Sequence, residues 1–303
     1  MMTQNKTLIC IVGPTASGKT LFAIQLAQSL NTEIISADSR QFYRELSIGT
    51  AKPSPQELAA VAHHFINNKS IQDTYSAGDF EKEALRKIDE LFKKHDTLIM
   101  VGGSGMYIDA VCNGFDPLPE VAHSIREDVI NKYESLGIGF LQEELKRLDP
   151  KYYESSDIQN PQRIMRALEV IYSTGKPFSD FRQKKAKQRD FRVKTYGLNW
   201  ERNELYARIN ARVDLMIKDG LEQEAKINAP FKDNYALCTV GYNEFFDYFD
   251  GKQDLKTTVS LIKQHTRNFA KRQLTWFRRN AETIWLDAKN ENAIFAVLNK
   301  LKE

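Results

Sequence analysis

Hydrophobic residues recur along the first part of the chain in two alternating patterns. Short strand-like runs occur at 8–12, 33–36 and 97–101, and residues 21–30 and 76–94 carry apolar side chains at every third or fourth position. The runs predict buried strands and the periodic segments predict amphipathic helices. Strands that alternate with helices are typical of a parallel sheet covered by helices. We therefore predict an α/β fold here.

The pattern changes in the middle of the chain. Strand signals disappear, and three helical periods follow one another at 121–136, 140–148 and 161–174. Residues 193–199 then read as a return to the sheet, so the helical part interrupts one core domain. The predicted domains are a P-loop-type α/β core at 1–115 and 195–303, and an all-helical insertion domain at 116–194.

Two long helices are predicted after the insertion, at about 202–218 and 254–280, before a last strand at 283–286 and a closing helix at 292–301. In the second long helix an apolar side is formed by Val259, Ile262, Phe269 and Trp276. Roughly opposite lie Lys263, Arg267, Lys271 and Arg278, with no acid between positions 263 and 279. Exposed helix faces usually mix charges of both signs, so we favour a surface that follows phosphates over an ordinary solvated face.

Composition adds limits without naming a function. The chain has 303 residues, 42% hydrophobic and 27% charged, with a net charge of only +3, so no general attraction to nucleic acid follows. The charge is uneven, because residues 182–194 hold seven basic side chains and one acid, Asp190. A solvated face and a site for a polyanion are equally compatible with that run.

The three cysteines, Cys10, Cys112 and Cys238, lie far apart and form no C-x-x-C pair. This spacing argues against a structural zinc site and a disulfide framework. The first strand begins close to the N-terminus, which leaves no signal segment, and no apolar run approaches the length of a membrane span. We expect a cytoplasmic protein that does not enter a membrane.

The most informative segment is Gly-x-x-x-x-Gly-Lys-Thr at 13–20, between a predicted strand and a predicted helix. Glycines let backbone N–H groups point inward and the helix N-terminus adds partial positive charge, which is typical of a phosphate-binding loop. Lys19 would contact phosphate oxygens and the Thr20 hydroxyl would ligate Mg²⁺. We expect a bound diphosphate or nucleotide rather than a glycine turn without a ligand. The predicted phosphate-binding residues are Gly13, Pro14, Thr15, Ala16, Ser17, Gly18, Lys19 and Thr20.

Two polar clusters follow other predicted strands. Asp38 comes just after the second strand and Ser104 lies in a glycine-rich turn, 102–105, after the third. The carboxyl ends of parallel strands share one edge of a sheet, so both side chains are predicted to lie near the phosphate loop. A cap on a helix beginning near Ser39 is the alternative for Asp38. The glycines would allow a ligand to approach the backbone closely. His63 and His64 have no metal-spaced partner and are interpreted as structural.

Three functions remain open on these features. A small-molecule kinase would use the phosphate loop and leave the basic surfaces without a role. An RNA-binding switch driven by nucleotide hydrolysis would use both, but no water-positioning signature is present. A transferase with a diphosphate donor and an RNA acceptor uses every feature.

Six segments together resemble the bacterial tRNA dimethylallyltransferase (tRNA isopentenyltransferase) family, in the order of that family and over nearly the whole chain. They are 13–20, 38–41, 102–107, 160–169, 240–242 and 266–278. Ser104 stands where the family usually has threonine, which keeps the hydroxyl. The zinc finger of the eukaryotic members is absent from this sequence.

The resemblance implies transfer of a dimethylallyl group from dimethylallyl diphosphate to N6 of the adenosine 3′ to the anticodon, with Mg²⁺ as cofactor and the target base flipped into a channel. Asp38 would be the general base, Lys19 would stabilise the leaving group and Ser104 would orient a substrate. Adenylate isopentenyltransferase and a P-loop kinase remain as alternatives. We expect a monomer whose macromolecular partner is the tRNA anticodon stem-loop. The residues implied to bind tRNA are Asp38, Ser39, Arg40, Gln41, Ser104, Arg126, Gln162, Arg163, Ile164, Met165, Arg166, Thr239, Val240, Gly241, Tyr242, Lys271, Arg272 and Arg278.

Overall fold

The computed structural model describes residues 6–182 and 187–301. Lys184 and Lys185 of the predicted basic run lie outside the described residues. The chain forms two compact units: residues up to Asn113 together with those from Gln188 onward, and residues Gly114–Lys187. Each unit is described by itself below.

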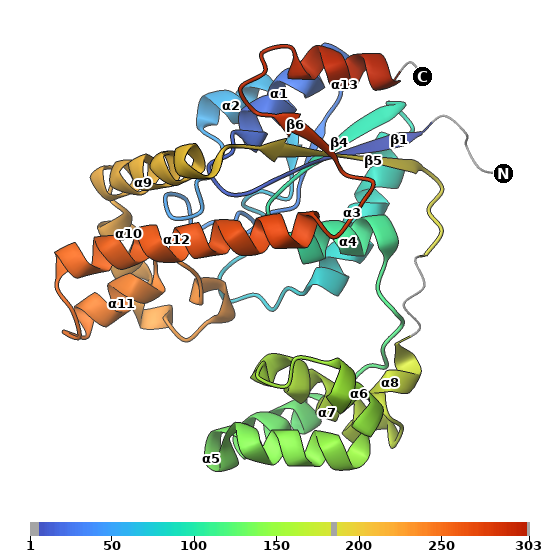
Figure 1. The fold of residues 1–303 in the computed structure, drawn as a ribbon, viewed down its shortest axis with the longest axis vertical. Helices are drawn as coiled ribbons and strands as arrows, with labels where there is room; N and C mark the ends of the chain where they lie inside the picture. Colours follow the sequence, from blue (N-terminus) through green and yellow to red (C-terminus); the bar gives the residue numbers. More distant parts are fainter. Residues whose placement is uncertain (1–5, 183–186, 302–303) are drawn as a thin grey trace. The chain divides into compact units, whose positions relative to one another are not determined.

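The first unit contains a single parallel sheet (Figure 1). Its strands are β1 (Thr7–Val12), β2 (Ile34–Ser36), β3 (His63–His64), β4 (Thr97–Val101), β5 (Arg192–Asn199) and β6 (Ile284–Asp287), in the spatial order β3-β2-β4-β1-β5-β6. Every neighbouring pair is parallel, which confirms the predicted parallel α/β core. Only β3 lacks a counterpart in the sequence-based prediction, because two residues are too few to show a strand pattern.

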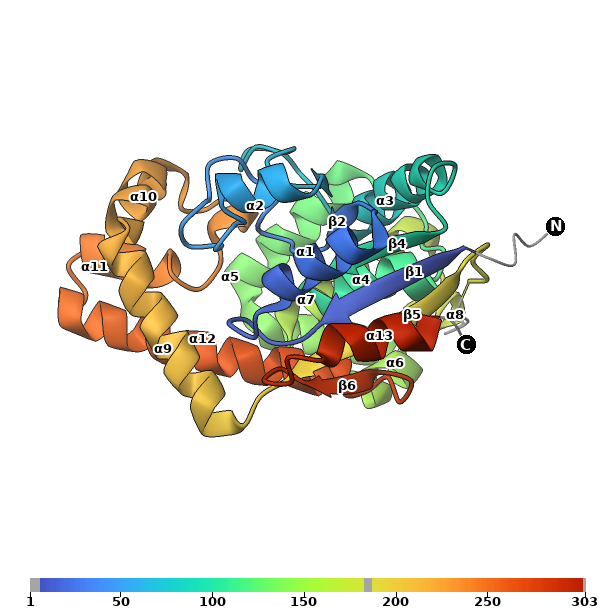
Figure 2. The same ribbon diagram turned by 90° about the horizontal axis from the view of Figure 1, so that it is seen from above.

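Helices cover both faces of the sheet in the first unit. They are α1 (Lys19–Leu30), α2 (Pro55–Ala60), α3 (Ala77–Leu91), α4 (Gly105–Asn113), α9 (Arg202–Lys218), α10 (Leu221–Asn228), α11 (Asn243–Phe249), α12 (Leu255–Phe277) and α13 (Ala293–Leu301). Figures 1 and 2 show α1 and α13 on one face and α3 and α4 on the other. Successive side chains of β1 point to opposite faces of the sheet. Ile9 and Ile11 pack with α1 and α13 on one face, whereas Cys10 contacts Cys112 of α4 on the other.

Side-chain caps mark the N-termini of several helices. Ser54 and Ser76 each form a capping box, with Glu57 and Asp79 respectively, at the starts of α2 and α3, and α3 begins where the sequence predicted a helix from residue 76. Helix α12 is capped by Asp254 and runs to Phe277, close to the predicted 254–280. These ends follow from side chains three residues apart, so they need no tertiary information.

The buried face of α12 differs from the predicted stripe. Its buried residues are Thr258, Ile262, Ala270, Gln273 and Phe277. Phe269, which we expected on the buried side, is 38% exposed and lines a cavity. The prediction at Phe269 was wrong because the helix buries polar groups such as Gln273, which a count of apolar residues does not detect.

The second unit is entirely helical, as predicted. It contains α5 (His123–Leu148), α6 (Pro150–Ser155), α7 (Pro161–Thr174) and α8 (Phe178–Phe181) around a core that includes Leu145 and Leu168. Gly137, with φ of 75°, breaks α5 where the sequence predicted a helix end. The unit ends at Lys187 rather than at residue 194. One reason is that Arg189 bonds Glu81 and the carbonyls of Ala110 and Val111, all in the first unit.

Candidate functional site

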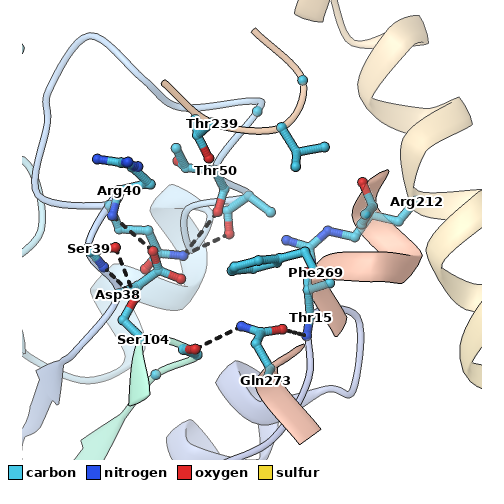
Figure 3. A pocket seen from close by; sticks show the side chains of 18 of the residues that line it. Thr15, Asp38, Ser39, Arg40, Thr50, Ser104, Arg212, Thr239, Phe269 and Gln273 are labelled. Atoms are coloured by element: carbon cyan, nitrogen blue, oxygen red, sulfur yellow. Dashed lines mark hydrogen bonds between the residues drawn. The ribbon is translucent and has the colours of Figure 1, made fainter. Parts of the chain in front are cut away.

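The loops that follow β1, β2 and β4 meet at one edge of the sheet, as the parallel topology requires. They line a cavity of about 410 Å³ together with α9, α12 and residues 238–241. Figure 3 shows this cavity, with Asp38, Ser104 and Thr15 on three different loops. Lys19, Thr20 and Asp38 therefore share one cavity, as the sequence predicted.

The phosphate loop adopts a conformation that requires glycine. Gly13 and Gly18 have φ of 144° and 88°, and a Cβ on Gly13 would lie 3.0 Å from the Leu198 carbonyl oxygen. The Lys19 Nζ donates to the Pro14 carbonyl at 2.7 Å, across the loop. Burial, with a smaller contribution from Arg212, lowers the pKa of Lys19 to about 7. The loop thus holds a buried amine that only a bound anion would keep fully charged at neutral pH.

Two arginines of α9, which sequence reasoning missed, supply further positive charge. Arg212 lines the cavity and its Nη1 lies 3.5 Å from the Thr15 hydroxyl. Burial lowers the pKa of Arg212, and Asp38 acts in the opposite direction. Arg208 donates to the Ala16 carbonyl at 2.8 Å and stacks on Trp200 at 4.2 Å. Their spacing of four residues on one helix face is a signal that could have indicated them.

Asp38 is held in a turn by its neighbours. Its Oδ1 accepts the Arg40 backbone N–H at 3.1 Å, so Asp38 stabilises a turn here rather than capping a helix. The Ser104 hydroxyl accepts the Ser39 N–H at 2.9 Å and donates to the Ser39 hydroxyl at 3.0 Å. Ser104 therefore fixes the residue next to Asp38, and we expect its effect on a substrate to pass through that turn.

The glycines at 102, 103 and 105 are closely packed against other segments of the first unit. A Cβ on Gly102 would lie 2.2 Å from the Ala37 carbonyl oxygen, one on Gly103 would lie 2.3 Å from Gln273, and one on Gly105 would lie 2.2 Å from Trp276. These positions are too close for any other residue. The glycines thus make room for the backbone after β2 and for α12, and Gly102 and Gly103 also line the cavity.

Gln273 connects the phosphate loop to the turn after β4. Its Oε1 accepts the Thr15 N–H at 2.7 Å, and its Nε2 donates to the Gly103 carbonyl at 2.8 Å (Figure 3). The side chain is buried, so loss of both bonds would leave a buried N–H and a buried carbonyl without partners.

Replacement of Gln273 by methionine is expected to weaken binding of inorganic diphosphate about tenfold, because the shape is kept while the Thr15 N–H is released. Isothermal titration of the variant measures this. Gln264→Met, at an exposed position of the same helix, is the control and should bind like the parent. Equal affinity in the two variants would show that the loop holds its conformation without Gln273.

The residues implied to bind tRNA separate into accessible and buried groups. Tyr242, Ile164 and Met165 have buried side chains, whereas Gln41 lines the cavity and its amide bonds Ser36 and the Thr50 and Ala51 carbonyls. Tyr242 instead donates to Glu224, which also accepts three backbone N–H groups of residues 47–49. Ile164 and Met165 pack in the core of the second unit, and the role of these positions in tRNA binding stays a prediction.

The others are accessible or line the cavity. Ser39, Arg40, Thr239, Val240, Gly241 and Arg272 line the cavity of the first unit, where Lys271 and Arg278 are also exposed. In the second unit, Gln162 and Arg163 are exposed at the start of α7. Arg126 and Arg166 both face the buried Glu169, at 3.5 Å and 2.9 Å.

Several basic side chains of α12 and of the run at 182–194 make internal contacts. Lys263 pairs with Asp214 at 2.6 Å, and Arg267 donates to Asn210 at 2.7 Å. In the run at 182–194, Arg189 pairs with Glu81 and Lys194 donates to the Lys300 carbonyl. Lys271 and Arg272 of α12 and Arg278, directly after it, remain exposed.

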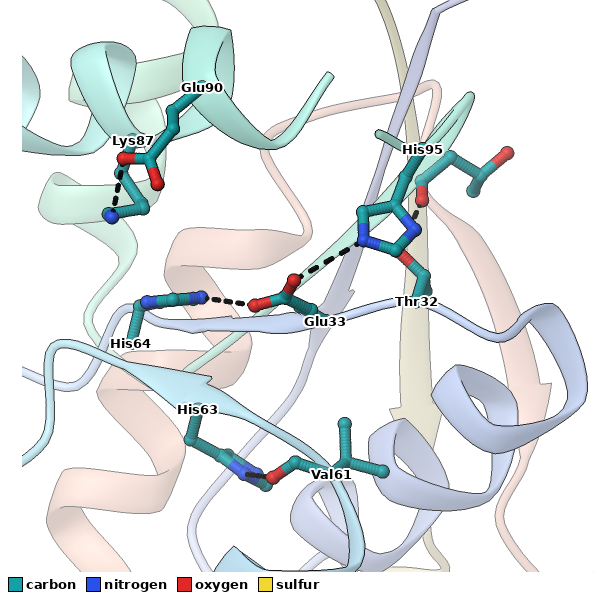
Figure 4. Close-up of polar contacts among 9 residues, drawn as sticks. Thr32, Glu33, Val61, His63, His64, Lys87, Glu90 and His95 are labelled. Carbon is teal, nitrogen blue, oxygen red and sulfur yellow. Dashed lines mark hydrogen bonds and ion pairs between the residues drawn. The ribbon is translucent and has the colours of Figure 1, made fainter. Parts of the chain in front are cut away.

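His64 makes a structural contact, as predicted, whereas His63 lines the cavity and its Nδ1 lies 2.8 Å from the Val61 carbonyl oxygen. His64 Nε2 lies 2.7 Å from Glu33, and His95 lies 3.3 Å from the other oxygen of the same carboxylate (Figure 4). Burial acts to raise the pKa of Glu33, but the two histidines outweigh it and the pKa is lowered. Glu33 thus links β2 and β3 to the loop before β4.

The oxygen atoms that line the cavity suit a metal cation that binds together with a phosphate-containing substrate. Within residues 6–182 and 187–301, no group of three or more His, Cys, Asp or Glu side chains could hold a metal ion. The Thr20 hydroxyl and the Asp38 carboxylate are oxygen ligands in the same cavity. Mg²⁺ prefers oxygen ligands and is often held by one or two protein groups together with substrate phosphates. These residues fit Mg²⁺ bound in that way.

No helix in the described part of the chain is both long enough and apolar enough to cross a membrane. Residues 41–280 match the model of the family described as IPP transferase. The chain is 53% identical to the tRNA dimethylallyltransferase of Christiangramia forsetii, over 95% of this chain and 96% of that protein, and 51% identical to that of Flavobacterium johnsoniae, over 93% of each.

Solved structures agree with these relatives. The tRNA isopentenylpyrophosphate transferase of Bacillus halodurans matches with a TM-score of 0.73 and 36% identity, over 99% of this chain and 96% of that one. A eukaryotic dimethylallyltransferase acting on tRNA matches with a TM-score of 0.81 and 26% identity, over 98% of this chain and 78% of that one. With its phosphate loop, its parallel sheet and its helical unit, this chain belongs to the IPP transferase family.

Proposed function

We propose that this protein transfers a dimethylallyl group from dimethylallyl diphosphate to N6 of the adenosine 3′ to the anticodon of tRNA. The observation that carries the proposal is a single cavity in which an anion-binding loop, Lys19 and Arg212 lie together with the carboxylate of Asp38. The loop, Lys19 and Arg212 fit a diphosphate, and the carboxylate of Asp38 fits a proton acceptor. The names of the relatives, tRNA dimethylallyltransferases, support the same reaction.

The donor end of the site stabilises a leaving group. When the C1–O bond of the donor breaks, the electron pair stays on the diphosphate, whose negative charge increases. The loop N–H groups, the Lys19 ammonium and the Arg212 guanidinium are already placed around that position, so little reorganisation is needed. Thr20 would hold Mg²⁺ there, which would supply additional charge neutralisation when bound.

The acceptor end removes a proton. The lone pair of adenine N6 is delocalised into the ring, so the amine is a poor nucleophile and benefits from a base. As the N6–C1 bond forms, the N6 proton passes to the carboxylate of Asp38. The turn made by Arg40, Ser39 and Ser104 keeps this carboxylate in place. An adenine stacked inside an RNA loop could not reach this cavity, so the target base must flip out.

The proposal includes a pH dependence of donor binding. Because burial lowers the pKa of Lys19 to about 7, the free enzyme holds a growing fraction of neutral amine above that pH. A bound diphosphate favours the protonated form, so binding takes up a proton and affinity falls by up to about tenfold per pH unit above pH 7.

Titration calorimetry of diphosphate between pH 6.5 and 9, in buffers of different ionisation enthalpy, measures this proton uptake. Lys19→Arg is the control, since a guanidinium stays charged and the titration of diphosphate itself is common to both proteins. Identical pH profiles for the parent and Lys19→Arg would rule out the role of Lys19 as the titrating group.

Radiolabelled dimethylallyl diphosphate, incubated with the protein, Mg²⁺ and unmodified tRNA, tests the reaction directly, with AMP and ATP as parallel acceptors. Label in tRNA alone supports the proposal. Label in a free nucleotide would instead indicate an adenylate isopentenyltransferase. Absence of label with every acceptor would favour a P-loop kinase, which does not consume allylic diphosphates.

We further propose a cytoplasmic monomer that contacts the anticodon stem-loop through both units. Support comes from the accessible residues Arg40, Lys271 and Arg272 in one unit and Gln162 and Arg163 in the other. Each Arg→Ala change at a position that contacts phosphate should reduce the slope of log tRNA affinity against log salt concentration by about one.

A further inference from the structure

Arg40 and Tyr235 form a stacked pair at the edge of the cavity. Arg40 follows β2 and lines the cavity, and Tyr235 begins the short 3-10 helix η2 (Tyr235–Leu237). The guanidinium carbon of Arg40 lies 4.7 Å from the centroid of the Tyr235 ring. One face of the tyrosine is therefore covered by a planar cation that belongs to the cavity wall.

The pair is held in place from both sides. Ala236 and Leu237, directly after Tyr235, are buried, and the Asn234 amide donates to the Ile71 carbonyl at 3.1 Å. The Arg40 Nη2 donates to the Cys238 carbonyl at 3.3 Å. Because its neighbours are anchored, Tyr235 presents its ring without the entropy loss that ordering a free loop would require.

Tyr235 itself is exposed to an unusual degree. It is 67% exposed, although an aromatic ring gains free energy when it leaves water. Burial and hydrogen bonding of the adjacent residues show that the segment is folded, so the exposure is not a consequence of a loose loop. The ring thus offers a fixed aromatic surface next to Arg40, which lines the cavity.

We propose that Tyr235, supported by Arg40, stacks an unpaired RNA base adjacent to the base that enters the cavity. The inference rests on the proposed function and specifies how the acceptor RNA is held. When a base flips out, its neighbours lose a stacking partner, and an aromatic ring at the cavity edge restores one. Single-stranded bases stack on aromatic and arginine planes in this way.

Charge favours RNA as the occupant of this surface. Lys19 and Arg212 lie in the same cavity as Arg40, and Lys271 and Arg272 are exposed on α12. A nucleic-acid strand would place its phosphates near such cations while a base covers the ring.

The test uses an unmodified anticodon stem-loop RNA and four variants of the full chain: Tyr235→Ala, Tyr235→Phe, Tyr235→Leu and Phe295→Ala. Phe295 in α13 is also 67% exposed and lies outside the cavity lining, so it controls for loss of an exposed aromatic. RNA affinity is measured at several salt concentrations, and inorganic diphosphate affinity is measured separately. A stem-loop with 2-aminopurine on either side of the target adenosine reports stacking by fluorescence.

Tyr235→Ala is expected to weaken RNA binding about tenfold, the effect of losing one stacked base. The slope of affinity against salt should not change, because no charge is removed. Tyr235→Phe should bind within about twofold of the parent, and Tyr235→Leu should fall between Phe and Ala. One of the two 2-aminopurine positions should be quenched by the parent and by Tyr235→Phe only. Diphosphate affinity should be the same in all variants.

Two results would overturn the proposal: RNA affinity of Tyr235→Ala equal to that of Phe295→Ala, or full restoration by Tyr235→Leu, which would indicate an apolar contact without stacking. Failure of the proposed function gives a different result, since the unaltered protein would then transfer no label to the stem-loop RNA from dimethylallyl diphosphate.

Discussion

Replacing Asp38 with alanine is expected to lower the rate of prenyl transfer by about a thousandfold, the contribution of a well-placed general base. The carboxylate is the proton acceptor in the proposed mechanism, and it shares a cavity with the phosphate loop. Single-turnover transfer of radiolabel to tRNA measures the effect. Affinity for tRNA and for diphosphate should stay within a fewfold, because neither requires the proton transfer.

Asp38→Asn separates this role from a structural one. Its amide oxygen can still accept the Arg40 N–H, so the turn that the aspartate stabilises is kept. We expect the asparagine variant to be nearly as inactive as the alanine variant. Normal turnover in Asp38→Asn would rule out Asp38 as the base. If Asp38→Asn were active and Asp38→Ala were not, the required function of Asp38 would be to stabilise the turn.

Arg212→Met is expected to lower kcat/KM for dimethylallyl diphosphate by about two to three orders of magnitude, similar to removal of one donor from an oxyanion site. Arg212 is partly buried beside Thr15 and lines the cavity, so its charge would act on the leaving diphosphate in a site that is less solvated than the surface. Steady-state kinetics with varied donor at saturating tRNA measure this loss.

Arg202→Met is the matched control, because Arg202 is an exposed arginine at the start of the same helix α9. It should leave donor kinetics unchanged. A second readout is chemical rescue: guanidinium ion added to Arg212→Ala should recover part of the activity and should not affect Arg202→Ala. A similar loss in both methionine variants would indicate a general effect on α9 rather than a role of Arg212 at the donor.

Features encoded by neighbouring residues could be predicted from the sequence. The phosphate loop at 13–20, the strands on each side of it and the caps at Ser54 and Ser76 depend on residues a few positions apart, so their pattern is visible in one dimension. The position of Asp38 near Lys19 also followed, because carboxyl ends of parallel strands share an edge.

Contacts between distant segments could not be predicted. Gln273 reaches Thr15 and Gly103, Arg212 reaches Thr15, and the thiols of Cys10 and Cys112 lie 3.5 Å apart. None of these pairs has a periodic or motif signal, because their proximity results from how α4, α9 and α12 pack against the sheet.

By itself the sequence determined the class of fold, the anion-binding loop and the set of segments shared with one family. Only the tertiary structure decided which members of those segments face a substrate. Tyr242, Ile164 and Met165 belong to motifs that resemble tRNA-binding ones, yet their side chains are buried, while Arg212 and Tyr235 lie at or beside the cavity without any motif. The reason is physical: a motif records residue types along the chain, whereas exposure and charge at a site are set by three-dimensional packing.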